Sequence, residues 1–197
     1  MISLCIPTYT LNKELEQMAL RCVRSFKEAC KLDNADYEVI ISEDGGMYSP
    51  SLMEEANVYI YNLDNQGFSK NVNMAWKNAK GEYVAIINSD TYYVSGYIKD
   101  MCVSGKVCSP RIINQDIEGF AGCFWVAHKD IPKTFGYLDE DMRIYYSDEI
   151  YKEKTKSVFE TVNSFSIYHG QAKTVTVAGV NTPEQYKIDK EVYDTKA

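Results

Sequence analysis

A chain of 197 residues is long enough to bury the core of one domain and only marginally long enough for two. Its 45% hydrophobic and 25% charged residues are typical of a globular protein and exclude a low-complexity chain. The formal net charge of −7 removes the general attraction to a phosphate backbone on which nucleic-acid binding depends.

The sequence contains no run of 18 apolar residues and does not begin with a basic segment followed by a long apolar one. We therefore expect a cytoplasmic protein. The six cysteines lie among apolar neighbours, without a CxxC pair or a Cys/His zinc spacing. This pattern indicates buried free thiols.

Apolar residues predict an alternation of strands and helices from the start of the chain. Ile2 to Ile6 is expected to form a buried strand that Pro7 ends. Apolar side chains at three- and four-residue steps predict a long amphipathic helix over 11–30. A second strand over 37–42 then leads into an acidic turn at 43–46.

The alternation continues with a short helix, a strand, a helix and a central strand at 51–56, 58–61, 68–79 and 83–87. Such an order implies an α/β fold with a mainly parallel central sheet flanked by helices. Ligands of these sheets bind beyond the carboxyl ends of the strands. Polar clusters occupy those ends, at Thr8-Tyr9, Glu43-Asp44 and Asn88-Ser89-Asp90.

The second half is less regular. Its predicted elements are strands at 106–109, 123–127 and 166–168 and a helix at 144–156. We expect a single compact domain over residues 1–180, with a nucleotide-binding half at about 1–100 and an acceptor-binding half at 101–180. The tail at 181–197 is polar and can form a helix.

The polar clusters point to metal-bridged phosphate binding. Neither GxxxxGK[ST] nor GxGxxG occurs, so the fingerprints of P-loop and Rossmann dinucleotide proteins are missing. A hard divalent cation held by oxygen ligands offers another way to neutralise a diphosphate. Asp90, which follows an apolar strand and opens a loop, is the best candidate for such a ligand.

In order and spacing, these motifs resemble the inverting GT-A glycosyltransferases of family 2. Ile86-Ile87-Asn88-Ser89-Asp90 looks like the DxD site of that family, and Ser147-Asp148-Glu149 looks like its Glu-Asp catalytic motif. The matching stretches are residues 2–9, 39–46, 65–71, 79–84, 86–90, 122–126, 135–140, 147–149 and 168–170. The resemblance covers roughly residues 1 to 175 and implies a GT-A fold.

The resemblance also implies roles for individual residues. Contacts to the base, ribose and diphosphate of a nucleoside diphosphate sugar would come from Pro7, Thr8, Tyr9, Glu43, Asp44, Lys70 and Asn71. Asp90 would be the main protein ligand of Mn²⁺ or Mg²⁺, and His169 a further one. Asn88 and Ser89 would lie beside the donor. Asp148 would be the general base that deprotonates an acceptor hydroxyl during one inverting displacement.

Three positions depart from the family pattern, namely Glu43, Asn88 and Ser147. Of these, Asn88 and Ser147 leave open a catalytically silent nucleotide- or sugar-binding module, whereas Glu43 bears on the choice of nucleotide. A nucleotidyltransferase is a second alternative, although it would normally bring a glycine-rich basic loop near the N-terminus. The acceptor stays open between a saccharide, a lipid-linked sugar, a protein and a modified nucleic-acid base, with Tyr92 and Tyr145-Tyr146 as acceptor-side candidates.

Overall fold

Eight strands form one mixed sheet in the computed structural model, which describes residues 1–115, 120, 122–170, 176–177, 179 and 183–196. The strands are β1 (Ile2–Thr8), β2 (Tyr37–Asp44), β3 (Val58–Asn62), β4 (Tyr83–Ile87), β5 (Thr91–Ser95), β6 (Val107–Ile112), β7 (Phe124–His128) and β8 (Phe159–His169). The helices are α1 (Lys13–Leu32), α2 (Pro50–Glu55), α3 (Phe68–Lys77), the 3-10 helix η1 (Ile98–Met101), α4 (Ile131–Phe135), α5 (Ser147–Thr155) and α7 (Pro183–Lys196).

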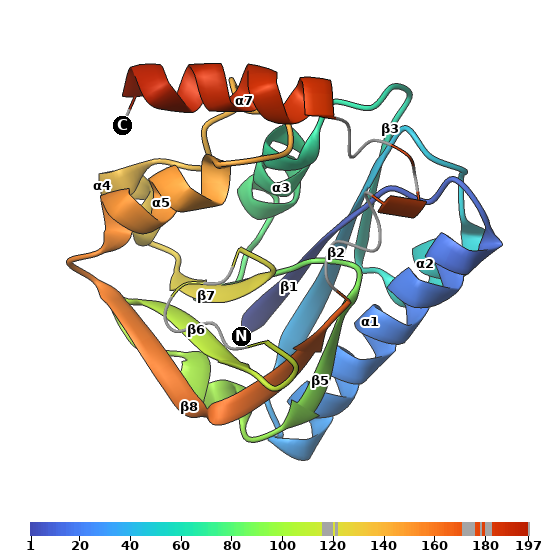
Figure 1. The fold of residues 1–197 in the computed structure, drawn as a ribbon. Coiled ribbons are helices and arrows are strands. Elements are labelled where there is room, and N and C mark those ends of the chain that lie inside the picture. Colours follow the sequence, from blue (N-terminus) through green and yellow to red (C-terminus); the bar gives the residue numbers. More distant parts are fainter. Residues whose placement is uncertain (116–119, 121, 171–175, 178, 180–182, 197) are drawn as a thin grey trace.

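The strand order is β3-β2-β1-β4-β7-β6-β8-β5. The first four strands in this order are parallel, and helices connect them in the chain, as the alternating pattern predicted. β7 is antiparallel to both β4 and β6, whereas β8 is parallel to β6 and antiparallel to β5. The α/β class is thereby confirmed, with a parallel half followed by a mixed half (Figure 1).

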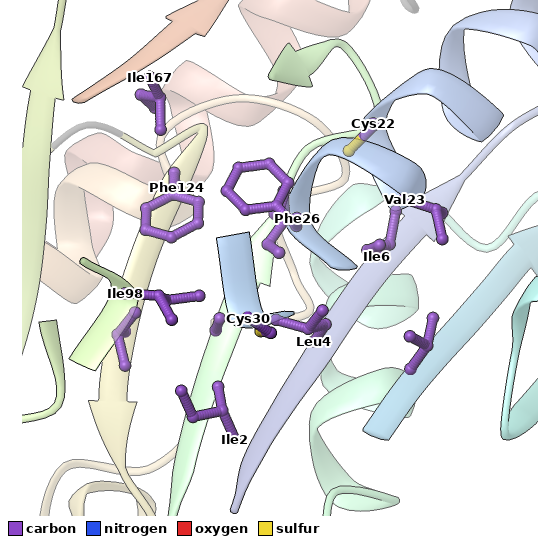
Figure 2. Close-up of a cluster of buried hydrophobic side chains, with 14 of the residues drawn as sticks. Ile2, Leu4, Ile6, Cys22, Val23, Phe26, Cys30, Ile98, Phe124 and Ile167 are labelled. Carbon is purple, nitrogen blue, oxygen red and sulfur yellow. The ribbon is translucent and has the colours of Figure 1, made fainter. Parts of the chain in front are cut away.

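Side-chain alternation along the strands builds one hydrophobic cluster on each face of the sheet. On β1, Ile2, Leu4 and Ile6 contribute to the first cluster, whereas Cys5 contributes to the second. Figure 2 shows the first cluster, in which side chains of β1 meet those of α1, including Phe26. The second cluster fills the opposite face, where α3 packs.

Two details of the sequence-based prediction were wrong at the ends of β1 and β2. Pro7 does not end the first strand, because β1 continues to Thr8 and pairs with β2 along its whole length. β4 accompanies β1 only as far as Cys5, so Pro7 lies where β1 has a neighbour on the β2 side alone, and a proline is tolerated there. Likewise, Glu43 and Asp44 belong to β2 and not to a turn.

The second half contains strands that the sequence pattern did not indicate. β5 was not predicted, and β8 begins at Phe159, well before the short strand expected at 166–168. Both strands are partly exposed and mix polar with apolar residues, so neither carries the continuous apolar run of a central strand. Within the described part of the chain, no helix is long and apolar enough to cross a membrane.

Candidate active site

The carboxyl ends of β1, β2 and β4 bring the predicted polar clusters to one edge of the sheet. Thr8 at the end of β1 pairs with Glu43 near the end of β2. β4 ends at Ile87, and Asn88 follows directly. This edge is where ligands of parallel α/β sheets bind, so the strand order brings the candidates to the side of the sheet that such ligands use.

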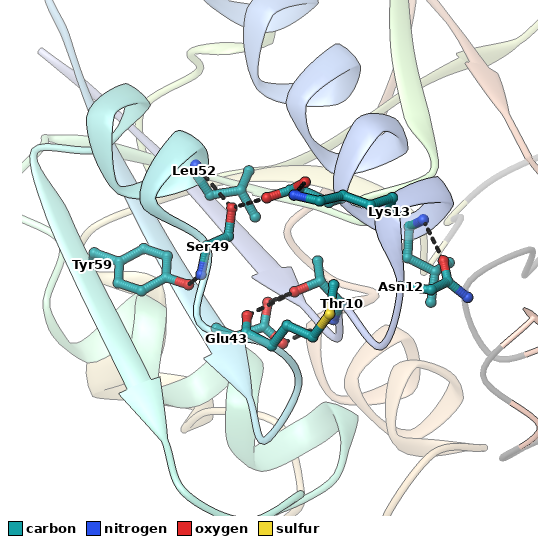
Figure 3. A network of polar contacts seen from close by, with 10 residues as sticks. Thr10, Asn12, Lys13, Glu43, Ser49, Leu52 and Tyr59 are labelled. Atoms are coloured by element: carbon teal, nitrogen blue, oxygen red, sulfur yellow. Dashed lines mark hydrogen bonds and ion pairs between the residues drawn. The ribbon is translucent and has the colours of Figure 1, made fainter.

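Glu43 braces the loop that follows β1. Its carboxylate is fully buried and accepts hydrogen bonds from the hydroxyls of Thr8 and Thr10, at 2.7 and 2.8 Å. It also accepts from the backbone N–H groups of Thr10 and Gly46, at 2.8 and 3.1 Å. Figure 3 shows Thr10 beside this carboxylate. Protein donors therefore use much of its capacity, while its predicted contact with a base or ribose stays a prediction.

We expect Glu43→Ala to lower the free energy of unfolding by about 2 to 5 kcal/mol, because the amides of Thr10 and Gly46 lose their acceptor. Glu43→Gln is the matched control. Its amide oxygen can still serve both backbone donors, and its NH₂ group can donate to the threonine hydroxyls, which can reverse direction. Urea unfolding at neutral pH measures both variants, and an equal loss in both would contradict this role.

A comparison of the wild type with Glu43→Gln tests the ionisation of this residue. Burial raises the pKa of Glu43, although its four hydrogen bonds act in the opposite direction. The folded state therefore binds a proton more tightly than the unfolded state. Relative to Glu43→Gln, the stability of the wild type should fall as the pH rises through this raised pKa.

Asp44 fixes the start of α3. Its carboxylate is 3% exposed and accepts from Asn62 Nδ2 at 3.1 Å and from the backbone N–H groups of Gln66 and Gly67, both at 2.9 Å. Gly67 has a φ of 93°, and a Cβ there would collide with Arg143, so this position requires glycine. Burial raises the pKa of Asp44, while its hydrogen bonds and Arg143 oppose the rise.

The two α3 candidates lie in different surroundings. Asn71 is buried and donates from Nδ2 to the backbone oxygens of Thr8 and Ser42, at 3.2 and 3.0 Å. Its Oδ1 is buried without a hydrogen-bond partner. Lys70 is exposed, and its Nζ donates to Gln66 Oε1 at 3.0 Å. Asn71 therefore joins the ends of β1 and β2, while the Lys70 ammonium lies outside the core.

The remaining donor-side candidates lie along the same loops. Pro7, Thr8 and Ser89 are buried, and Tyr9 is half-buried. The backbone N–H of Asn88 donates to the Cys123 oxygen at 2.9 Å, which ties the end of β4 to the residue before β7. Asn88 Oδ1 is buried without a hydrogen-bond partner.

Pairing between β5 and β8 brings Asp90 and His169 together. Thr91 pairs with His169, and the N–H of Gly170 donates to the Asp90 backbone oxygen at 2.8 Å. His169 Nε2 lies 3.4 Å from Asp90 Oδ1, and Asp90 is 2% exposed. Gln115 Nε2 lies 3.1 Å from His169 Nδ1 on the other side of the ring.

The charge of His169 depends on this pairing. Burial lowers the pKa of its imidazole, but Asp90 and Cys123 outweigh that effect and raise the pKa to about 10. Without a metal, the ring is thus a cation next to the Asp90 carboxylate. Binding a metal through Nε2 would release this proton, because a ligating imidazole is neutral.

The side chains of Asp90 and His169 fit a cation that takes its other ligands from a diphosphate. Two buried side-chain atoms, Nε2 of His169 and Oδ1 of Asn88, have no hydrogen-bond partner. Among the residues that the structure describes, no cluster of three or more His, Cys, Asp or Glu side chains could hold a metal. Asp90 and His169 therefore offer a partial site, and Mg²⁺ or Mn²⁺ would take further oxygen ligands from phosphate and water.

Asp148 lies in the first turn of α5, against Gly122. A Cβ at position 122 would overlap the Asp148 carboxylate, so only glycine leaves room for it. Burial and the neighbouring charge of Glu149 raise the pKa of Asp148. Gly122 directly precedes Cys123, whose carbonyl receives the Asn88 N–H. A short chain of contacts thus links Asp148 to the loop of Asn88 and Asp90.

Some residues of the site carry no recognisable sequence signal. Thr10 directly follows the matched stretch of residues 2–9, and its position there is the one hint in the sequence of its contact with Glu43. Gln115 approaches His169 through tertiary structure alone. The acceptor-side candidate Tyr92 stacks on Tyr168, with ring centroids 6.1 Å apart, next to His169 in β8.

Comparison with known proteins adds to this geometry. The model of the family described as Glycosyl transferase family 2 matches residues 3–102, which contain all of β1 except Ile2, β2 to β5 and the Asn88-Ser89-Asp90 segment. No curated protein sequence matches the chain.

Several solved structures share the fold. The chain is similar to S. aureus TarS, with a TM-score of 0.64, 17% identity, and coverage of 85% of this chain and 36% of that one. The structure of S. aureus TarS 1-349 in complex with UDP-GlcNAc matches with a TM-score of 0.66 and 14% identity. This match covers 95% of this chain and 64% of that one. The mannosyltransferase PcManGT from Pyrobaculum calidifontis, in complex with GDP-Man and Mn²⁺, matches with a TM-score of 0.66 and 12% identity. This match covers 89% of this chain and 59% of that one. The chain thus spans between about a third and two thirds of these proteins.

Proposed function

The chain belongs to glycosyl transferase family 2, and from this premise we propose that it transfers a sugar from a nucleoside diphosphate sugar to an acceptor hydroxyl. We further propose that a divalent cation assists the reaction and that the anomeric centre is inverted. The observation that carries the proposal is that Asp90 lies against His169 just beyond the carboxyl end of β4. Asp148 packs against Gly122, next to Cys123, whose carbonyl accepts from the N–H of Asn88 in the same loop as Asp90.

The donor class is supported by the proteins that share the fold. TarS was solved with UDP-GlcNAc and PcManGT with GDP-Man and Mn²⁺. In this chain the ends of β1 and β2 would receive the nucleoside, and the loop of Asp90 would receive the diphosphate. Family membership argues against the nucleotidyltransferase alternative.

Asp148 would act as the general base. Its carboxylate takes the proton of the acceptor hydroxyl while that oxygen forms a bond to the anomeric carbon. The bond from this carbon to the diphosphate oxygen breaks, and the nucleoside diphosphate leaves with the electron pair. One displacement from the opposite face inverts the centre, and no protein nucleophile is needed.

Asp90 and His169 would hold the metal at the donor diphosphate. When bound, Mn²⁺ or Mg²⁺ neutralises the negative charge that develops on the leaving group. Asp90 is buried, and its Oδ1 lies 3.4 Å from His169 Nε2, so one cation could contact both side chains. The raised pKa of Asp148 brings a carboxylate base closer to the neutral range in which a base works best.

A thermal-shift panel tests the donor class. The wild type is heated with nucleoside diphosphates and their sugars, with Mn²⁺ or with a chelator. One nucleotide at 100 times its Kd should add about 2.7 kcal/mol and raise the Tm by about 5 to 10 °C, in the presence of metal. If no nucleoside diphosphate raises the Tm under either condition, the proposal fails. Stabilisation without any nucleotide release would favour the silent binding module.

A further inference from the structure

We propose that Asp189, in the C-terminal helix α7, is a positioning residue that anchors the turn leading into Asp148. This inference rests on the proposed function, because it treats Asp148 as the base. Asp189 touches neither the donor site nor the base itself. It acts through residues 143–146, which directly precede α5.

The Asp189 carboxylate binds three successive backbone amides. Its Oδ1 accepts from the N–H of Arg143 at 3.0 Å, and its Oδ2 accepts from those of Ile144 and Tyr145, both at 2.9 Å. Gln185 Nε2, one turn earlier on α7, donates to Oδ1 at 2.8 Å. Consecutive amides that point to one place form an anion-binding concavity, and here the anion is a side chain of the protein.

Asp189 is buried, which distinguishes its contact with the turn from an exposed surface contact. Asp189 is 0% exposed, although most of α7 is exposed. A carboxylate is removed from water at high cost unless strong donors replace the water. Bonds from amides to a charged acceptor are such donors. The amides of 143–145 and the Asp189 carboxylate thus satisfy each other.

Tyr146, the next residue, has an unusual backbone that the same helix holds in place. Its φ of 65° lies in the left-handed region, which non-glycine residues adopt where their surroundings enforce it. The rings of Tyr186 and Tyr193, both on α7, lie 5.3 and 5.0 Å from the Tyr146 ring. Asp148 follows two residues later, so the conformation of Tyr146 sets the direction in which α5 begins.

The opposite side of the turn is held by α3. The N–H of Phe68 donates to the Arg143 oxygen at 2.7 Å, and the Ser69 hydroxyl donates to the Met142 oxygen at 2.7 Å. In the view of Figure 1, α7 lies at the top, above α3 and α5. The turn is therefore clamped between α3 and α7. Removing the α7 side would leave its amides without acceptors and the first turn of α5 free to shift.

Asp189→Asn tests the anchor, because the variant keeps only one acceptor oxygen for three amides. A displacement of about 1 Å at a reacting group can lower a rate by about a hundredfold, so we expect kcat to fall by about tenfold to a hundredfold. The donor KM should stay within about twofold, because Asp189 makes no contact with the predicted donor residues. Glu191→Gln is the matched control, since it removes an exposed charge from the same helix.

Hydrogen exchange gives a readout that does not depend on activity. In the wild type the amides of Ile144 and Tyr145 should exchange slowly, and in Asp189→Asn at least about tenfold faster. Glu191→Gln should leave them unchanged. If these amides exchange in the folded wild type as fast as an unstructured segment, the anchor is refuted, even if the Asp189 variant does not fold.

Tyr193→Leu is the second variant, because it removes a ring from Tyr146 without disturbing a buried charge. It should lower kcat and leave the donor KM unchanged. Wild-type kcat in both variants, or a loss of donor affinity equal to the loss of kcat, would overturn the positioning role. If Asp148→Asn retains full transfer, the proposed base is wrong, whereas the exchange rates still decide whether Asp189 anchors the turn.

Discussion

Asp148→Asn should lower sugar transfer by about 10² to 10⁴ while donor affinity stays nearly the same. Asparagine preserves the volume of the side chain, so the space beside Gly122 remains filled. It cannot accept a proton at neutral pH, however, and the acceptor hydroxyl then has no base. Binding and chemistry should therefore separate in this one variant.

The measurement is paired. Calorimetry gives the donor affinity, and nucleotide release gives the rate, either with an acceptor or as slow donor hydrolysis without one. Glu153→Gln is the matched control, because this residue of α5 is exposed and its carboxylate forms an ion pair with Lys156. If the Asp148 variant releases nucleotide as fast as the wild type, Asp148 is not the base.

The pH dependence of the wild type offers a check on the same residue. Burial and Glu149 raise the pKa of Asp148, so its carboxylate takes up a proton at a higher pH than an ordinary aspartate. A base works only when it is deprotonated. The activity of the wild type should therefore fall as the pH drops through this raised pKa. The remaining activity of Asp148→Asn should not fall over the same pH range.

Asp90→Asn should abolish the metal-dependent stabilisation by a nucleoside diphosphate and reduce turnover severely. The Asp90 carboxylate lies against His169 Nε2, so the variant removes the negative charge that this residue brings to the partial site. A neutral carboxamide oxygen is a weaker ligand for a hard dication. Most of the stabilisation of about 2.7 kcal/mol that the donor gives the wild type at 100 times its Kd should be lost.

Asp36→Asn is the matched control for this variant, because Asp36 is exposed and precedes β2 at the opposite end of the strand. Circular dichroism of both variants verifies that the fold persists. Titration with Mn²⁺ in the presence of the nucleotide then compares them. A metal-dependent shift of wild-type size in Asp90→Asn would show that the cation is held elsewhere.

The sequence by itself determined the architecture of the first half and the positions of its polar strand ends. Apolar runs and helical periodicity locate β1, α1 and β4, because a central strand and an amphipathic helix each impose a pattern on adjacent residues. The same patterns place Asp90 and Asn88 just beyond a buried strand. The family resemblance found in these segments agrees with the family match over residues 3–102.

Only the tertiary structure decided which of these side chains meet and how far each is buried. The pairing of β5 with β8 places His169 beside Asp90, yet the sequence pattern indicated only residues 166–168 of β8 and no part of the half-exposed β5. Glu43 accepts hydrogen bonds from Thr8 of β1 and Thr10 in the loop after β1. Asp189 lies in a mostly exposed helix, yet it is fully buried against the turn before Asp148. Contacts of this kind join residues far apart in the chain, so no local pattern of polar and apolar residues records them.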